Sequence, residues 1–319
     1  MARRLRFGIL GTGNIAGQFA EGVRGSERAE VVSVGSRSGE SARAFAGKFG
    51  VAKPQAAYEA VLADAGVDAV YVSLPNTMHR EWTLAALRAG KHVLCEKPLV
   101  PTAGEAEELF DAAARSGRVL IEAFMYRTHP LMREVVAHVR SGAIGAVKAI
   151  RASFCYATGN VTDNIRFRPD LCGGSIMDIG CYPVDLGRLI TGEHPSSIQV
   201  SAHLHESGVD DYAAGTLTYP GGVVLSFVCG QRVQMNNVAV IGGDGGYIEV
   251  PVPWKPPARG VYGGGGGVGG GGRVQDRGAV SRSRKRRRRG SGWWRWGRRC
   301  MGSRRTRLRR RCWTVPRRS

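Results

Sequence analysis

The sequence lacks the features that mark membrane and secreted proteins. It contains no run of about 18 apolar residues, so it offers no segment that could span a bilayer. The basic residues at its start are followed by a short apolar stretch that breaks at Gly11, which is not the pattern of a signal peptide. The seven cysteines are scattered, odd in number and without a CxxC pair. We therefore expect reduced thiols, no metal site, no membrane contact and a cytoplasmic location.

Acidic residues are nearly absent from the last fifth of the chain. Residues 259–319 hold 21 basic residues and one acid, Asp276, whereas residues 1–258 hold 25 residues of each sign. The formal net charge of +20 therefore belongs to the tail. The preceding 258 residues are neutral and long enough for two domains, and they give no reason to expect a specific nucleic-acid partner.

The chain opens with a strand, a glycine-containing loop and a helix. The apolar run Leu5–Leu10 is followed by a G-x-G-x-x-A pattern. In this pattern Gly11 permits a tight turn, Gly13 lets a pyrophosphate approach the backbone, and Ala16 is small enough for the helix to pack on the strand. The free N–H groups at the helix start favour an anion. The pattern predicts a dinucleotide site that includes Gly11, Thr12, Gly13, Asn14 and Ile15.

The second predicted strand, Glu30–Gly35, indicates which dinucleotide is bound. Sites that prefer NAD place an acid at the carboxyl end of this strand, but Glu30 lies at its start. Ser36 and Arg37 occupy the carboxyl end, and a hydroxyl beside a guanidinium suits a 2′-phosphate. We therefore favour NADP over NAD. The alternative is that Arg37 stacks on adenine or points to solvent.

Strands and helices alternate as far as residue 122. This alternation predicts an α/β domain, residues 1–122, with a doubly wound parallel sheet of the Rossmann type. Thr102 and Glu105 form a capping-box pattern at the start of one helix, and Asn76 is a candidate cap for another. The further strands expected in this sheet are Asp68–Leu74, Lys91–Cys95 and Val119–Tyr126.

Ligands of such sheets bind at the carboxyl ends of the strands. Glu96 and Lys97 follow one expected strand, and Leu74 ends another. His79, in the first turn of the following helix, either contacts the cofactor or has a structural role. We therefore expect Leu74, Asn76, His79, Glu96 and Lys97 at the cofactor site.

The pattern changes after residue 122. Longer strands with alternating polarity follow, and Pro220-Gly221-Gly222 predicts a hairpin turn. Helices are expected over Pro130–Arg140 and Ile176–Thr191. We infer an α+β domain, residues 123–255, with an open, mainly antiparallel sheet that has helices on one face. Its open face could join copies of the chain into a homo-oligomer.

Four motifs together resemble a known family. They are the glycine loop, Glu96-Lys97-Pro98, Glu122 to Arg127, and Gly173 to Tyr182. Their order and spacing are similar to those of the glucose–fructose oxidoreductase / inositol dehydrogenase (Gfo/Idh/MocA) family over residues 5–255. The last two motifs look most like the subgroup that includes dihydrodiol dehydrogenase and NADP-dependent xylose dehydrogenase. The resemblance implies NAD(P) bound between the two domains, often a cis peptide before Pro98, and an arginine, Arg166, that reaches the cofactor.

The resemblance also implies hydride transfer between a nicotinamide and a sugar, polyol or cyclic diol. Such chemistry needs a group that moves the hydroxyl proton. Asp178 and Tyr182 are four apart on an expected helix and share one face. We expect the Lys97 ammonium to lower the pKa of Tyr182, so that these two form a proton-transfer pair that Asp178 orients. The alternative is a structural role for Asp178 and Tyr182 in an impaired family member.

The resemblance ends where the tail, residues 256–319, begins. The tail is dominated by Gly, Arg and Trp and shows no heptad, apolar face or strand alternation, so we expect disorder. One hypothesis is an arm whose Arg and Trp side chains bind nucleic acid or other polyanions. We favour a shifted reading frame that begins near residues 256–262. Sequencing the gene tests this, because the other frame should restore a family-like ending.

Overall fold

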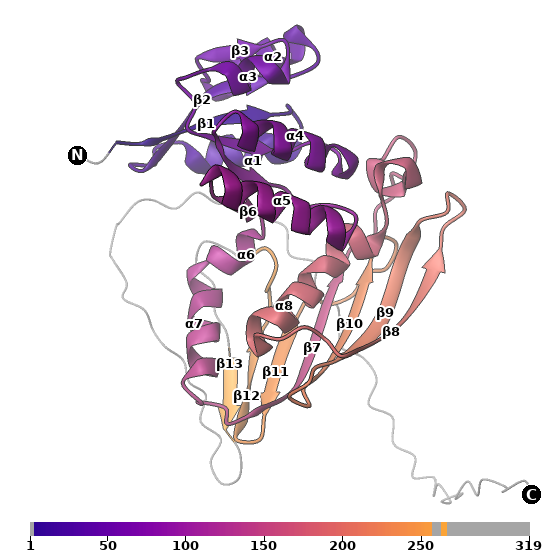
Figure 1. Ribbon diagram of the computed structural model, residues 1–319. Helices are drawn as coiled ribbons and strands as arrows, with labels where there is room; N and C mark the ends of the chain where they lie inside the picture. The colour runs from indigo at the N-terminus through magenta and orange to yellow at the C-terminus, as the bar shows by residue number, and fades with distance from the viewer. Residues whose placement is uncertain (1–2, 257–262, 267–319) are drawn as a thin grey trace, which may run out of the picture. The chain divides into compact units, whose positions relative to one another are not determined.

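Figure 1 shows the computed structural model of the chain, which describes residues 3–256 and 263–266. The hypotheses of a basic arm and a shifted reading frame, and the disorder expected for residues 257–262 and 267–319, lie outside the described residues. The expected disorder is wrong for Gly263–Gly266, which form a strand that pairs with Gly246–Glu249. The described residues form two sheets, one of six strands and one of seven. None of the helices in this part of the chain is long and apolar enough to cross a membrane.

The first sheet is parallel throughout, with the strand order β3-β2-β1-β4-β5-β6. This order confirms the expected Rossmann sheet, because the chain winds outward from β1 in both directions. The switch between β1 and β4 opens a crevice at the carboxyl ends of the strands, where ligands bind. The strands are β1 (Leu5–Leu10), β2 (Ala29–Gly35), β3 (Lys53–Gln55), β4 (Ala69–Val72), β5 (His92–Cys95) and β6 (Leu120–Glu122).

Helices cover both faces of this sheet, which explains why β4 and the second half of β1, at its centre, are buried on both sides. Ile9 and Leu10 are adjacent in β1 but belong to different apolar clusters, since successive side chains point to opposite faces. The capping box of Thr102 and Glu105 is confirmed, but Asn76 makes no capping bond. The helices are α1 (Asn14–Val23), α2 (Gly39–Phe49), α3 (Tyr58–Ala63), η1 (Asn76–Met78), α4 (His79–Arg88) and α5 (Ala103–Ser116).

The second sheet has the order β13-β12-β11-β7-β10-β9-β8. Only β7 and β10 pair in parallel, so the expected mainly antiparallel sheet and the hairpin between β9 and β10 are confirmed. The strands are β7 (Val147–Cys155), β8 (Ser197–Leu204), β9 (Asp210–Thr218), β10 (Val224–Gly230), β11 (Ala239–Gly243), β12 (Gly246–Val250) and β13 (Gly263–Gly266).

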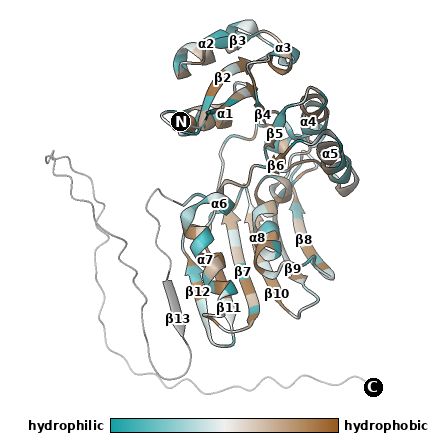
Figure 2. Ribbon diagram, turned by 60° about the vertical axis from the view of Figure 1, so that its left-hand side comes forward, coloured by the Kyte–Doolittle hydropathy of each residue, from teal (hydrophilic) through white to brown (hydrophobic). Residues whose placement is uncertain are grey.

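Helices α7 and α8 lie on one face of the second sheet (Figures 1 and 2). Their apolar side chains, such as Val135 and Leu186, pack on residues of β7 and β10 such as Ile150 and Leu225. Figure 2 shows hydrophobic residues, in brown, along β7 and β10. The helical segments are α6 (Met125–Thr128), α7 (Pro130–Arg140), η2 (Ile165–Phe167), η3 (Pro169–Leu171), the π-helix η4 (Ile176–Gly180) and α8 (Cys181–Thr191).

Two expected elements end or begin differently from the prediction. The strand expected over Val119–Tyr126 stops at Glu122, and its last residues turn into α6 instead. The helix expected over Ile176–Thr191 begins as a π-helix and becomes α-helical at Cys181. Hydrophobic spacing does not reveal such a widened turn, which is common at functional sites.

Candidate active site

The glycine loop leaves space in front of α1. Gly11 has φ +102°, and a Cβ there would lie 2.8 Å from the Ser73 carbonyl oxygen, so only glycine fits. A Cβ on Gly13 would meet nothing within 4 Å, and no side chain caps α1. The first N–H groups of α1 are therefore available to an anion, and the loop from Gly11 to Ile15 fits the pyrophosphate of a dinucleotide.

The end of β2 places a hydroxyl and a guanidinium beside the start of α2. Ser36 is buried, and its Oγ accepts a hydrogen bond from the Ser38 N–H at 3.3 Å. Ser38 caps α2 by accepting from the Ser41 N–H, while Arg37 is exposed. Burial raises the pKa of Tyr58, and the nearby Arg37 opposes that shift. An exposed cation at this strand end suits the 2′-phosphate of NADP.

Two residues that follow β4, Leu74 and Asn76, contact different segments. Leu74 lies near the glycine loop, and Asn76 contacts the loop before η4. The side chain of Leu74 reaches within 3.2 Å of the position that a Cβ on Gly11 would take. The amide of Asn76 donates to the Cys172 carbonyl at 2.9 Å, so it holds the loop before η4. Both residues thus lie at the expected edge of the sheet.

His79 lies in the first turn of α4, as expected, but its ring is enclosed by the protein. Its side chain is fully buried, and its ring nitrogens lie 2.9 Å from the carbonyl oxygens of Leu74 and Pro98. Each ring nitrogen therefore lies within hydrogen-bond distance of a main-chain carbonyl oxygen. The burial of the ring favours the structural role of His79 over the expected contact with a cofactor, because the ring has no exposed surface.

The turn after β5 carries Glu96 and Lys97. The Glu96 carboxylate accepts from the Tyr71 hydroxyl at 2.5 Å and from the Lys97 N–H at 3.3 Å. The peptide bond between Lys97 and Pro98 is cis, which confirms what the resemblance implied. The Lys97 amine donates to the carboxylate of Asp178 at 2.9 Å and to its carbonyl oxygen at 2.7 Å. Asp178 therefore holds the lysine of the expected proton-transfer pair.

Asp178 collects three further donors on its second carboxylate oxygen. These are the Tyr156 hydroxyl at 2.9 Å, Arg166 Nε at 2.8 Å and Gln231 Nε2 at 3.1 Å. Burial alone would raise the pKa of Asp178, but the charges of Lys97 and Arg166 and these hydrogen bonds lower it to about 2. The carboxylate therefore stays ionised and fixed. Arg166, expected to contact the cofactor, uses its Nε on Asp178.

The sequence prediction missed Tyr156 and Gln231. Tyr156 directly follows β7 and Gln231 directly follows β10, and these two strands are parallel neighbours. Their carboxyl ends therefore meet at one edge of the sheet, where both side chains reach Asp178. A polar residue just beyond an apolar strand was the available signal, but the pairing of β7 with β10 was not foreseeable.

The start of η4 is set by glycine and by a half-buried carboxylate. A Cβ on Gly173 would lie 2.4 Å from the Arg166 carbonyl oxygen, so the chain can pass there only as glycine. Asp210 accepts from the Ser175 hydroxyl at 2.5 Å and from the Ile176 N–H at 2.8 Å. These contacts hold the π-helical turn that carries Asp178.

Tyr182 projects from α8 into an aromatic cluster. Its ring is 4% exposed and lies 5.2 Å from Phe124, 5.1 Å from Phe154 and 5.7 Å from Trp254. The Lys97 amine lies 5.5 Å from the centre of the Tyr182 ring. Within the described residues the hydroxyl has no hydrogen-bond partner, yet it is not among the enclosed polar atoms. It is therefore not fully enclosed by these residues.

The expected lowering of the Tyr182 pKa is wrong. Burial raises the pKa of Tyr182, and the neighbouring Cys181, Glu96 and Asp178 add to the shift. The Lys97 amine is directed to Asp178 instead of the phenol. Tyr182 is consequently a protonated phenol at neutral pH.

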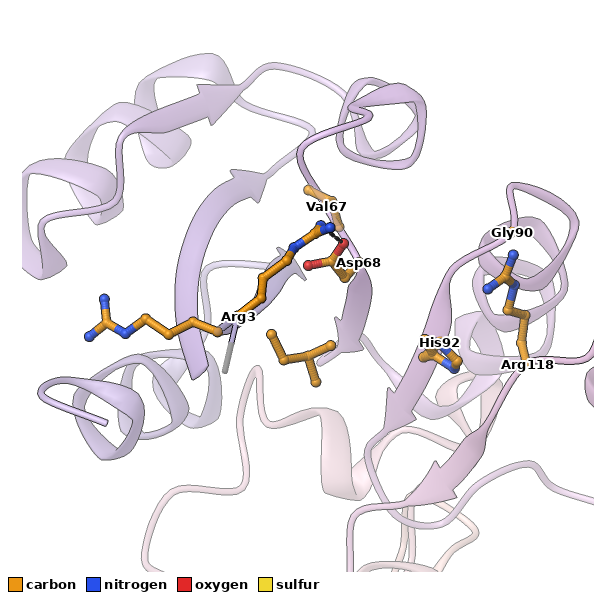
Figure 3. A pocket seen from close by; sticks show the side chains of 8 residues that line it. Arg3, Val67, Asp68, Gly90, His92 and Arg118 are labelled. Carbon is orange, nitrogen blue, oxygen red and sulfur yellow. Dashed lines mark hydrogen bonds and ion pairs between the residues drawn. The ribbon is translucent and has the colours of Figure 1, made fainter. Parts of the chain in front are cut away.

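A separate pocket lies at the opposite ends of the strands (Figure 3). Arg3, Asp68, His92 and Arg118 are among the residues that line it. Asp68 immediately precedes β4 and His92 begins β5, whereas Lys97 follows the other end of β5. Hydrogen bonds from Arg6 lower the pKa of Asp68, and Arg3 pairs with it too. This pocket is therefore distinct from the site around Lys97.

Comparisons with known proteins show which family the chain is similar to. Residues 5–124 match the model of the GFO/IDH/MocA oxidoreductase family with an NAD-binding Rossmann fold, and residues 132–249 match a C-terminal domain of that family. D-xylose 1-dehydrogenase (NADP(+)) 2 from Haloferax volcanii is 41% identical over 219 residues, which is 68% of this chain and 67% of that protein. Trans-1,2-dihydrobenzene-1,2-diol dehydrogenase from Mus musculus is 33% identical over 79% of this chain and 76% of its own length.

A solved structure agrees with these matches. The crystal structure of a 3-ketoreductase from Actinomadura kijaniata, in complex with NADP and TDP-benzene, superposes with a TM-score of 0.74 and 32% identity. The match covers 82% of this chain and 81% of that one. The identities and the shared fold over both sheets lead to one conclusion: the chain belongs to the GFO/IDH/MocA family of oxidoreductases.

Proposed function

We propose that the chain is an NADP-dependent oxidoreductase that transfers hydride between the nicotinamide and a carbinol or carbonyl carbon of a sugar, polyol or cyclic diol. One observation carries the proposal: the Lys97 amine, in the turn after β5, is fixed on the Asp178 carboxylate and lies 5.5 Å from the centre of the Tyr182 ring. Relatives named for xylose and for dihydrodiols, and a solved relative in complex with NADP, support the substrate class and the cofactor.

The same chain segments supply groups that would hold NADP. The loop Gly11–Ile15 would bind the pyrophosphate, and Ser36 with Arg37 would bind the 2′-phosphate. Leu74, Asn76, Glu96, Lys97 and Arg166 would line the rest of the cofactor site. The bound nicotinamide supplies or accepts the hydride.

Tyr182 is the group that we propose to move the proton. Because burial raises its pKa, the phenol carries its proton in the free enzyme and can donate it to a carbonyl oxygen during reduction. The Lys97 ammonium would stabilise the phenolate that results, and Asp178 keeps that ammonium in place. In the oxidation direction Tyr182 must first lose its proton, so we expect oxidation to become faster as pH rises.

A substrate panel and one substitution test the proposal. Aldoses, inositols and dihydrodiols, with their carbonyl counterparts, are assayed with NADP or NADPH. Tyr182→Phe should lower kcat by roughly 10²- to 10⁴-fold and leave NADP affinity nearly unchanged. Tyr219→Phe is the control, because Tyr219 is also buried and its hydroxyl has no partner within the described residues. Wild-type turnover by Tyr182→Phe would remove Tyr182 as the acid.

We also propose how the chain is organised beyond the site. The domains are residues 1–122 and 123–255, followed by the tail 256–319. Tyr212, Val224 and Tyr247 are exposed on the second sheet and could join copies into a homo-oligomer. A cytoplasmic location is supported by the five cysteines of the described residues, all of which are free thiols.

A further inference from the structure

Three side chains fasten the turn that carries Lys97. Glu96 accepts a hydrogen bond from Tyr71, and the Leu99 N–H donates to the Glu122 carboxylate at 2.8 Å. Between these two attachments, the Pro98 carbonyl oxygen lies 2.9 Å from His79 Nδ1. The turn has neither helix nor strand structure, so contacts from other elements determine where Lys97 lies.

Pro98 offers only one main-chain group for such a contact. Proline has no N–H, so its carbonyl oxygen alone can be held by a hydrogen bond. Each nitrogen of the His79 ring faces a carbonyl oxygen, and a neutral imidazole has a single N–H to donate. The Pro98 carbonyl oxygen therefore accepts a hydrogen bond from His79 only when the ring proton is on Nδ1.

The two contacts of His79 differ in what they connect. Leu74 is five residues from His79, and the segment between them is already closed by the bond from the Met78 N–H to the Pro75 carbonyl at 2.9 Å. The contact with Pro98 spans 19 residues and joins α4 to the turn after β5. Only the contact with Pro98 can affect the position of Lys97, because Pro98 is the next residue in the turn.

We propose that His79 is a positioning residue whose Nδ1–H holds the Pro98 carbonyl and so keeps the Lys97 amine on Asp178. The inference rests on the proposed function of Lys97. It assigns His79 no contact with substrate or cofactor, in agreement with its burial. His79 acts through the main chain of the neighbouring residue.

Two amide substitutions separate the contacts. The amide nitrogen of asparagine takes the place of Nδ1, and that of glutamine takes the place of Nε2. His79→Asn therefore keeps a donor for Pro98, and His79→Gln keeps one for Leu74. We expect kcat of His79→Asn to exceed that of His79→Gln on the order of tenfold, because a misplaced catalytic group slows the reaction. Their melting temperatures and NADP affinities should be similar, since each loses the ring and each keeps one donor to a main-chain carbonyl oxygen.

A purely structural role would affect both variants alike. Equal kcat in His79→Asn and His79→Gln, or a faster glutamine variant, overturns the proposal. Each measured kcat is compared at saturating substrate, and KM is recorded separately.

A measurement on the unaltered chain covers the case in which a variant does not fold. Nuclear magnetic resonance of nitrogen-labelled histidine reports which ring nitrogen carries a proton. His79 is the buried one among the chain's seven histidines, so its ring proton exchanges most slowly with water. A proton on Nδ1 supports the proposal, and a ring protonated only on Nε2 overturns it. If the unaltered chain turns over no substrate, the proposed function fails while this spectrum still decides the role of His79.

Discussion

Asp178 is the residue on which the hydrogen bonds of the site converge. Four donors reach its carboxylate, and they come from the turn after β5, the ends of β7 and β10 and the loop before η4. A buried carboxylate is tolerable only with such compensation. The same donors hold its pKa at about 2, below the ordinary value of 3.8. Its main role is therefore to keep the charge and position of Lys97.

This lowered pKa predicts how stability depends on pH. A carboxylate whose pKa is lower in the folded state stabilises the fold above its unfolded pKa and loses that contribution as pH falls. We expect the chain to lose about 2 kcal/mol of unfolding free energy through Asp178 as pH falls from 3.8 to about 2. Urea unfolding across this range measures the loss, which Asp178→Asn should lack. Asp111→Asn, on an exposed residue, should retain it. Parallel curves for the unaltered chain and Asp178→Asn would contradict the prediction.

Single residues were predictable from the sequence where local motifs specify them. The glycine loop and Glu96-Lys97-Pro98 are continuous in sequence, so their place at strand ends follows from local pattern. The role of His79 was left open because its position in the first turn of α4 does not reveal which side its ring faces. Tyr156 and Gln231 were missed since they meet Asp178 only after β7 and β10 pair.

At the scale of elements, Trp254 links the end of the second domain to the site. Its side chain is 1% exposed, and its Nε1 donates to the Ser153 carbonyl at 2.7 Å. The ring lies 5.4 Å from Tyr126 and 5.7 Å from Tyr182. The segment after β12 is therefore part of the packing that supports the catalytic phenol.

Replacing this tryptophan should destabilise the chain and disturb the site. We expect Trp254→Ala to lower the unfolding free energy by about 3–5 kcal/mol, because it leaves a cavity and an unpaired carbonyl. Val252→Ala, nearby but 46% exposed, should change it far less. Chemical denaturation measures both variants. Similar unfolding free energies for the two would show that the aromatic cluster does not depend on Trp254.

The presence of helices and strands was more predictable than the residues at which they begin and end. The parallel, doubly wound character of the first sheet followed from the alternation of strands and helices, and the hairpin from its proline and glycines. The π-helix at Ile176–Gly180 was not predictable, since its apolar spacing resembles that of an ordinary helix. The early end of β6 at Glu122 likewise depends on tertiary contacts, among them the hydrogen bond of that carboxylate to Leu99.

At the scale of the molecule, the second sheet has one face on which no helix of residues 3–256 lies. Val224 is opposite Ala149, which is opposite Gly242 and in turn Tyr247, so Val224 and Tyr247 share a face. The adjacent residue Leu225 is buried on the other face, against the helices. Exposed apolar residues on a broad sheet face favour association of copies.

Charge substitutions on this face should weaken assembly. We expect the double change Val224→Lys and Tyr247→Lys to shift the chain toward a monomer, because buried lysines would have no partners. Sedimentation velocity measures the state. Phe110→Lys, on a residue of α5 that is 50% exposed, is the control. An unchanged sedimentation coefficient in the double variant would exclude this face as the interface.

The distribution of charge predicts that NADP-dependent turnover and polyanion binding belong to different parts of the chain. The residues before position 259 are neutral, and the excess of 20 positive charges lies beyond them. A chain that ends after β13, at Gly266, retains every residue of the proposed site. We expect it to keep NADP affinity and turnover, while retention on heparin falls to that of a neutral protein, because polyanion binding follows the number of cations. Loss of NADP binding on truncation would instead tie the tail to the site, and tight binding to one DNA sequence by the full chain would favour the basic-arm hypothesis.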